Sequence, residues 1–155
     1  MGKFLKNVLE FLKKMNNWKF KLEKDFDFVL DYEIPEHSVH LVSGPNNKSF
    51  GYAHVRGEYT YIRIFEGYAW DGATPKFSVL DLFWIGTPDG LLYCGKPKIY
   101  HSTLIHDFLL QFRKELGLTR KQCDDRFLEE MTKNKFKLRW IYYLVVRMYA
   151  ILTGK

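Results

Sequence analysis

The stretch HSTLIHDFLLQF contains two side chains that could act in catalysis or metal binding, His106 and Asp107. The rest of the run has the composition of a buried helix. Further along, Asp124 shares an apolar helical stripe with Phe127 and Met131, whereas its neighbour Asp125 points toward solvent. A buried carboxylate is costly unless it is paired. We therefore expect Asp124 to find a donor on the helix that carries His106.

A carboxylate that holds one imidazole nitrogen fixes the tautomer and leaves the other nitrogen available as a general base at neutral pH. Asp107 lies about 100° further around the helix and should project beside the ring. An oxygen ligand at that place suits Ca²⁺ or Mg²⁺, with Asp71, Asp89 or nearby carbonyls completing the shell. The pattern predicts His106 and Asp124 as catalytic residues, with Asp107 and Asp71 as metal ligands.

A structural interpretation of the same residues stays open. His106 and Asp124 could only stabilise a helical hairpin, with Asp107 on the surface and Asp71 closing an Asx turn with Gly72. The other histidines do not extend the site. His101 lies about 140° away from His106 on an ideal helix, and the remaining three show no metal-ligand spacing: His37, His40 and His54.

The helices that position these residues are predicted in the last third of the chain, residues 98–154. One runs from about residue 98 to residue 116 and stops at Gly117. The next opens at Thr119, with Gln122 completing a capping box, and continues through Met131. The short GLT link forces an antiparallel hairpin. The third segment, KLRWIYYLVVRMYAILTG, is predicted as a buried or interfacial helix, because it is too short and too charged to span a membrane.

Residues 25–66 show the period-two alternation of strands, which predicts an antiparallel β meander. The run FDFVLDYEI is the first of these strands, followed by HSVHLVS, FGYAHV and YTYIRIF. Residues 67–97 then lose any sustained period and are rich in Gly, Pro and Asp. Such a long irregular stretch is more often functional than idle, so we expect it to form a wall of the site.

Residues 1–20 are predicted to form an amphipathic helix with a basic polar face. A helix of this kind docks most often on its own domain, but a partner or a membrane surface is also open. Its apolar face combines aromatic and aliphatic residues at helical spacing: Phe4, Leu5, Val8, Leu9, Phe11, Leu12 and Met15.

The whole chain, 155 residues with 46% hydrophobic and 17% aromatic content, predicts a single α+β domain. The net charge of +6 is concentrated at both ends. This favours an anionic partner surface, such as anionic lipid, although a cationic surface kept for solubility is equally open and no nucleic-acid motif is present. Two cysteines without paired spacing predict neither a disulfide framework nor a zinc site. No signal-peptide core or lipidation motif is evident.

Four motifs follow one another along the chain: GYAWDGATP at Gly67–Pro75, HDFLL at His106–Leu110, CDDRF at Cys123–Phe127 and VVRMYAILTG near the end. In this order they resemble a family of small phage and prophage proteins of unknown function. The resemblance implies a phage-type protein, located in the host cytoplasm or the virion.

The helix pair is also distantly similar to secreted and parvoviral phospholipases A2. That resemblance implies His106 as the base for a water molecule, Asp107 as a Ca²⁺ ligand and Asp124 as the residue that orients His106. YCGKPK, at Tyr93–Lys98, stands where the calcium loop of that family is expected.

The sequence thus predicts a hydrolase that attacks a phospholipid-like ester, with an anionic membrane as one partner. An alternative of another class is a non-catalytic phage protein, either a virion component or an inhibitor of a host function, which binds a host or virion protein. A metal-dependent phosphohydrolase of the His-Asp type is a third interpretation, but its all-helical scaffold and additional upstream His are not evident. The sequence gives no oligomeric state.

Overall fold

The computed structural model describes residues 20–70, 92–93, 96–97 and 99–154. Residues 1–19 of the predicted N-terminal helix lie outside these residues, and so do Asp71, Asp89 and most of the predicted site wall. The strands are β1 (Phe20–Lys21), β2 (Phe26–Leu30), β3 (Ser38–Ser43), β4 (Lys48–Arg56), β5 (Tyr59–Ile64), β6 (Ala69–Trp70), β7 (Leu92–Tyr93) and β8 (Lys96–Pro97). The helices are α3 (Tyr100–Gln111), α4 (Arg120–Lys133) and α5 (Arg139–Thr153).

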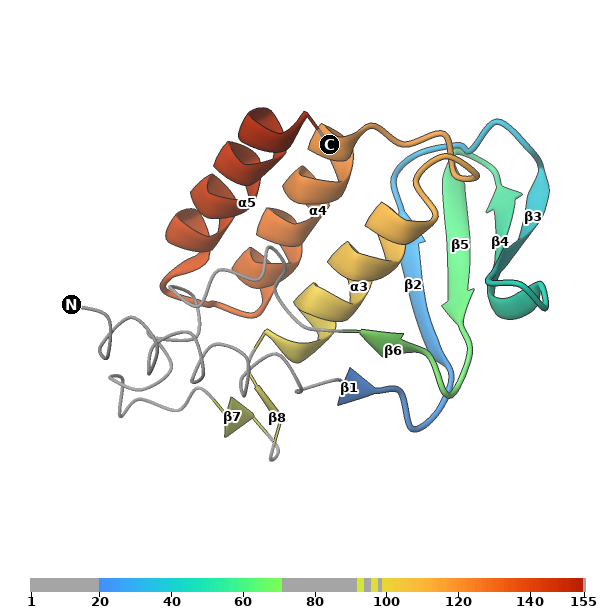
Figure 1. Ribbon diagram of the computed structural model, residues 1–155, viewed down its shortest axis with the longest axis horizontal. Helices are drawn as coiled ribbons and strands as arrows, with labels where there is room; N and C mark the ends of the chain where they lie inside the picture. The colour runs from blue at the N-terminus through green and yellow to red at the C-terminus, as the bar shows by residue number, and fades with distance from the viewer. Residues whose placement is uncertain (1–19, 71–91, 94–95, 98, 155) are drawn as a thin grey trace, which may run out of the picture.

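This architecture is α+β, as predicted, with strands first and helices last (Figure 1). The main sheet is antiparallel, in the order β2-β5-β4-β3. Strands β3, β4 and β5 follow one another as a meander, whereas β2 pairs with β5 at the other edge. Two short antiparallel pairs, β1 with β6 and β7 with β8, complete the strands of the described chain.

The predicted alternation of buried and exposed residues is present in the sheet. In β5 every second residue is buried, and the same faces of β2 and β4 turn inward. These inward residues form the sheet side of the core: Phe28, Leu30, Gly51, Ala53, Val55, Thr60, Ile62 and Ile64.

The first strand is shorter than the alternation predicts, because β2 ends at Leu30 instead of continuing to Ile34. Beyond Leu30, a side chain forms the hydrogen bonds that a neighbouring strand would otherwise form. The Thr60 hydroxyl donates to the carbonyl of Tyr32 at 2.6 Å and accepts from the Ile34 N–H at 3.2 Å. These backbone groups therefore have hydrogen-bond partners without strand pairing. The period-two pattern of hydrophobic residues does not reveal that a side chain replaces the neighbouring strand here.

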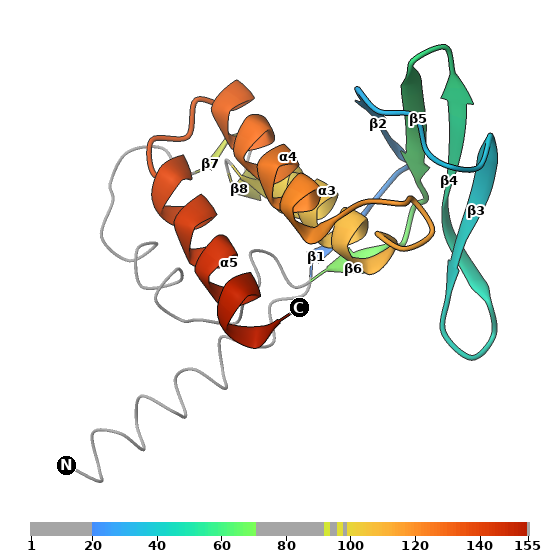
Figure 2. The ribbon, with the colours of Figure 1, turned by 90° about the horizontal axis from the view of Figure 1, so that it is seen from above.

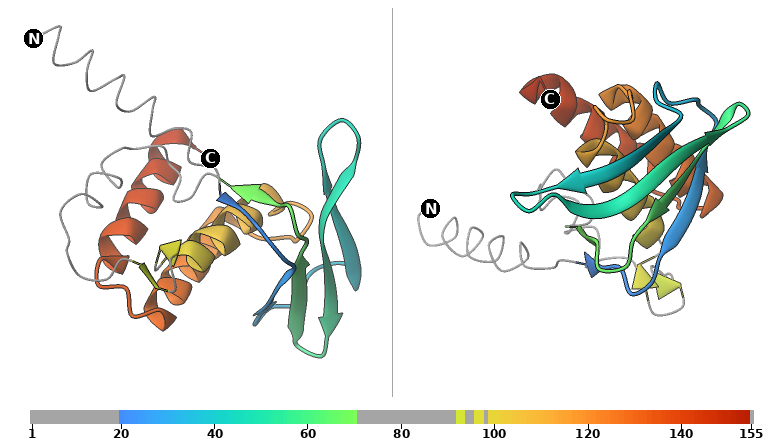
Figure 3. Two further views of the ribbon diagram at one scale, coloured as in Figure 1. Left: turned by 90° about the horizontal axis from the view of Figure 1, so that it is seen from below. Right: turned by 90° about the vertical axis from the view of Figure 1, so that its right-hand side faces the viewer.

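Helix α3 packs directly on the sheet, with α4 behind it and α5 on the side farthest from the sheet (Figures 1 and 2). The close approach uses Gly51, where an added Cβ would lie 2.7 Å from the Phe108 ring. Trp70 of β6 donates its indole N–H to the Thr103 hydroxyl of α3 at 3.2 Å. The right-hand view of Figure 3 shows the sheet from its outer side, with the helices behind it.

Helix α3 is also shorter than predicted, because regular α-helix ends at Gln111 and residues 112–117 form turns. Gly117 nevertheless has the left-handed conformation that was predicted for the end of this segment. Gly117 has φ +65°, and the Leu118 N–H closes the turn onto the Arg113 carbonyl at 2.7 Å. An added Cβ at Gly117 would lie 2.6 Å from Pro35, so the turn packs tightly against the connection between β2 and β3.

The second helix begins as predicted. Thr119 is the N-cap, and both hydrogen bonds of the capping box with Gln122 are present. Helix α5 packs on α4 through a second apolar cluster: Ile99, Phe127, Met131, Phe136, Tyr142 and Val146. Among the described residues, none of the helices has the length and hydrophobicity that crossing a membrane requires.

Two glycine substitutions should separate backbone strain from the contact with Pro35. Gly57 has a similar φ of +66° but nothing within 4 Å of an added Cβ. We expect Gly57→Ala to lower the free energy of unfolding by about 1–2 kcal/mol through the left-handed backbone alone. Gly117→Ala should cost about 1–3 kcal/mol more, because the methyl group also overlaps Pro35. Urea unfolding measures both, and equal losses would contradict a tight contact at Gly117.

Candidate functional site

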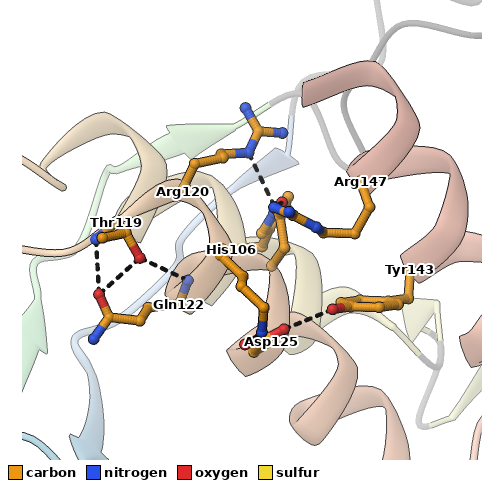
Figure 4. A network of polar contacts seen from close by, with 9 residues as sticks. His106, Thr119, Arg120, Gln122, Asp125, Tyr143 and Arg147 are labelled. Carbon is orange, nitrogen blue, oxygen red and sulfur yellow. Dashed lines mark hydrogen bonds and ion pairs between the residues drawn. The ribbon is translucent and has the colours of Figure 1, made fainter. Parts of the chain in front are cut away.

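The centre of the candidate site is the carboxylate of Asp124, which is 0% exposed and lies where the three helices meet. Its Oδ1 accepts from His106 Nε2 of α3 at 2.8 Å and from Arg120 Nε of α4 at 3.0 Å. Its Oδ2 accepts from Arg147 Nη1 of α5 at 3.1 Å. Figure 4 shows Arg120 and Arg147 converging beside His106 from different helices. The predicted pair of His106 and Asp124 is therefore formed, within a larger network.

The charge state of Asp124 follows from these donors. Burial alone would raise the pKa of the carboxyl group, because it disfavours the charged form. The hydrogen bonds from His106 and Arg147 and the charge of Arg120 outweigh burial, so the pKa is lowered from its usual value. Asp124 is ionised at neutral pH and can only accept hydrogen bonds.

An acceptor-only Asp124 determines the tautomer of His106, because Nε2 must carry the hydrogen in their contact. Burial lowers the pKa of the imidazole, an effect that the interaction with Asp124 opposes and the charge of Arg120 reinforces. The ring is therefore neutral near pH 7, with a bare lone pair on Nδ1. No hydrogen-bond partner for Nδ1 is present among the described residues.

Packing holds the imidazole in this orientation. His106 is 0% exposed, and its ring stacks on Phe127 of α4 with the centroids 4.6 Å apart and the planes 21° from parallel. One face of the ring therefore lies against an aromatic side chain while its edge bonds Asp124. The ring cannot rotate without losing both interactions.

Asp107 lies where the sequence predicts it, beside the ring. Its Oδ1 is 3.9 Å from His106 Nδ1, which is too long for a hydrogen bond, and its side chain is 12% exposed. The bare Nδ1 therefore has a carboxylate oxygen nearby, without a direct hydrogen bond to it.

Asp125 faces solvent as predicted, with its side chain 42% exposed. It accepts from the Tyr143 hydroxyl at 2.7 Å and pairs with Lys121. The two adjacent aspartates therefore both link α4 to α5, one inside the helix layer and one at its surface (Figure 4). Asp125 serves as a natural control for Asp124.

The predicted Ca²⁺ site is incomplete in the part of the chain that the structure describes. No group of three or more His, Cys, Asp or Glu side chains is gathered there to hold a metal ion. Asp107 alone falls short of the six or more oxygen ligands that Ca²⁺ takes, and Asp71 lies outside the described residues. His101 stacks on the Phe26 ring, with the centroids 4.9 Å apart, and does not join the site.

A hollow of about 740 Å³ lies over the outer face of the main sheet, between the side chains of β2 to β5. None of its lining residues belongs to the cluster around Asp124. They are Asp27, Phe28, Val29, His40, Tyr52, His54, Tyr61, Ile62, Arg63 and Phe65. The hollow therefore gives no access to His106.

Sequence reasoning missed Arg120 and Arg147 as members of the network. Arg120 could have been found, because it precedes Asp124 by four residues, the spacing of a helical ion pair. The signal for Arg147 is its place in an otherwise apolar helix, where a cation needs an anionic partner. Its contact with Asp124 spans 23 residues of sequence, and no local pattern specifies it.

Comparison with known proteins adds no assignment, since no family model, no curated protein and no solved structure matches this chain. The resemblances to the phage family and to phospholipases A2 therefore stay predictions.

Neutralising the two aspartates should have very different effects. Asp124→Asn removes the buried charge and leaves Arg120 and Arg147 without their anion, so we expect a loss of about 3 kcal/mol in the free energy of unfolding. Asp125→Asn, with its side chain 42% exposed, should cost about 1 kcal/mol or less. Urea unfolding of both variants provides the comparison. Similar losses would show that Asp124 does not organise the helices.

The lowered pKa of His106 predicts how stability depends on pH. The unfolded imidazole takes up a proton below about 6.5, whereas the buried ring resists protonation. The contribution is therefore fully present above pH 6.5 and is lost as the pH falls toward the lowered folded value, by at most about 1.4 kcal/mol per pH unit.

The matched variant is His106→Gln, which keeps a donor for Asp124 but does not titrate. The difference in stability between wild type and this variant should shrink from about pH 7.5 to about pH 5.5 in urea unfolding. A difference that stays constant or grows on acidification would contradict a neutral buried His106.

Proposed function

We propose that the protein is an ester hydrolase in which His106 Nδ1 acts as the general base and Asp124 orients the ring. The observation that carries the proposal is the bare Nδ1, which has no hydrogen-bond partner among the described residues while Nε2 is fixed on Asp124. Asp107 Oδ1 lies 3.9 Å from this nitrogen and supplies a second acceptor.

A buried nitrogen without a partner is unusual in a pair that serves stability alone. Leaving such a group unsatisfied costs about 1–3 kcal/mol, and most buried polar atoms in folded proteins are satisfied. Catalytic sites often keep such a cost, because the free lone pair is the group that reacts. The lowered pKa of His106 also keeps that lone pair unprotonated at neutral pH.

The reaction that fits this arrangement is attack by water on a carboxylic ester. His106 Nδ1 takes a proton from a water molecule as the water oxygen bonds to the carbonyl carbon. The ester C–O bond then breaks, and the imidazolium returns the proton to the departing alcohol oxygen. Asp124 stabilises the transient positive charge on the ring, since it already accepts from Nε2 at 2.8 Å.

A phospholipid-like ester is the substrate class that we favour. Support comes from the arrangement of His106, Asp107 and Asp124 on two facing helices, which fits the roles that the resemblance to phospholipases A2 implies. The positive net charge favours an anionic lipid surface. Ca²⁺ binding by Asp107 with Asp71 stays part of the prediction, and no step above depends on it.

A second function has its own support. His106 and Asp124 are both 0% exposed, and Asp124 joins three helices through its contacts with His106, Arg120 and Arg147. A cluster of this kind also suits a non-catalytic phage-type protein, whose surface binds a host or virion protein. In that case His106 contributes stability, and its removal abolishes no reaction.

Fatty-acid release from phospholipid vesicles separates the two functions. We expect release by the wild type and by Asp125→Asn, with a loss of at least a hundredfold in His106→Gln, because a general base contributes about that factor or more. Running each reaction with Ca²⁺ and with a chelator tests the predicted ion. The folded state of each variant is checked by circular dichroism.

Two results would contradict the proposed hydrolase. One is the absence of release by a folded wild-type protein on carboxylic ester lipids. The other is undiminished release by folded His106→Gln. The first result would favour the non-catalytic function, and the second would remove His106 as the general base.

A further inference from the structure

Helix α5 exposes an apolar stripe along its full length. Six large side chains on this 15-residue helix are between 42% and 80% exposed: Trp140, Ile141, Leu144, Met148, Ile151 and Leu152. On an ideal helix they fall within an arc of about 120°. A contiguous exposed patch of this kind marks an interaction surface rather than a set of scattered surface residues.

The stripe is separate from the face by which α5 packs on its own domain. Tyr142, Val146 and Ala150 are buried and lie on the opposite side of the helix. Helix α5 is therefore apolar on two faces, but α4 covers only one. Because α5 is farthest from the main sheet, no strand of that sheet stands over the exposed face (Figures 1 and 2).

Charge indicates what covers the stripe. No acidic residue follows Glu130 in the sequence, whereas Lys133, Lys135, Lys137, Arg139, Arg147 and Lys155 do. Lys135 and Lys137 are exposed in the segment that leads into α5. An apolar stripe next to exposed basic side chains is complementary to an anionic lipid surface, which accepts the apolar residues and attracts the lysines.

The same charges disfavour two other occupants. A second copy of the chain would bring the same basic segment onto itself. Residues 1–19, the chain's own predicted amphipathic helix, carry five lysines and one glutamate, so their docking on α5 would also place like charges together.

We infer that the protein docks on anionic membranes through the exposed face of α5, with the helix lying in the plane of the interface. Trp140 and the five aliphatic or thioether side chains enter the boundary between headgroups and acyl chains. The lysines before the helix contact anionic headgroups. The helix lies on the membrane and does not cross it, since no described helix is long and apolar enough to do so.

Vesicle flotation of the full chain tests this surface. The double variant Leu144→Glu with Ile151→Glu places charge in the stripe at positions 57% and 71% exposed, where folding is not at stake. The matched control is Val42→Glu with Tyr59→Glu, which adds the same charge to exposed apolar positions on the sheet. We expect wild type and control to float with vesicles of phosphatidylcholine and phosphatidylserine. The α5 variant should not float, and phosphatidylcholine alone or high salt should weaken flotation of the wild type.

Three outcomes would overturn the inference. If the wild type does not float with the vesicles, the stripe does not bind a membrane. Flotation of the α5 variant at the wild-type level assigns binding to another surface, such as residues 1–19. A wild-type dimer that the α5 variant converts to monomer, seen by light scattering, assigns the stripe to a second copy.

The docking surface is independent of the proposed hydrolysis, because flotation requires no turnover. Flotation without fatty-acid release would keep the docking surface and contradict the hydrolase. Fatty-acid release by a wild type that does not float would keep the hydrolase and contradict the docking surface.

Discussion

The arrangement of the helices depends on one buried negative charge. Asp124 is removed from water, and the free energy of burying it is offset only because donors from three helices reach it: His106, Arg120 and Arg147. Each donor requires its helix to stand in one position relative to the carboxylate. The charge thus specifies how α3, α4 and α5 meet, beyond what apolar packing alone would require.

The same charge controls the chemistry available at His106. An ionised Asp124 accepts the Nε2 hydrogen, while burial of the ring, reinforced by the charge of Arg120, lowers the pKa of His106 and disfavours a second proton. Phe127 stacks on the ring and belongs to the apolar cluster between α4 and α5. Asp124 and Phe127 therefore contribute both to the packing of the helices and to the site. Substitutions at Asp124 report on both, whereas His106→Gln removes the titrating ring and keeps a donor for Asp124.

The sequence predicted those features that local spacing determines. The Thr119 and Gln122 capping box and the inward position of Asp124 follow from residues three or four apart, so both were correct. Features that depend on distant contacts were missed. Arg147 meets Asp124 only because α5 crosses α4 at a particular place. Strand β2 ends at Leu30 because its partner β5 begins at Tyr59, and the Thr60 hydroxyl bonds the backbone of Tyr32 and Ile34 beyond that point. The solvent-facing stripe of α5 could not be told from a buried one, since hydrophobicity alone does not say which of two apolar faces is covered.

The most direct test of this account is the protonation of the two ring nitrogens of His106, measured by ¹⁵N NMR of the labelled imidazole near neutral pH. His106→Gln identifies the signals. The account predicts a neutral ring with hydrogen on Nε2 and a bare Nδ1, while Asp124→Asn should change this state. An imidazolium, or a neutral ring protonated at Nδ1, would contradict the central role of Asp124 and remove the base on which the proposed hydrolysis depends.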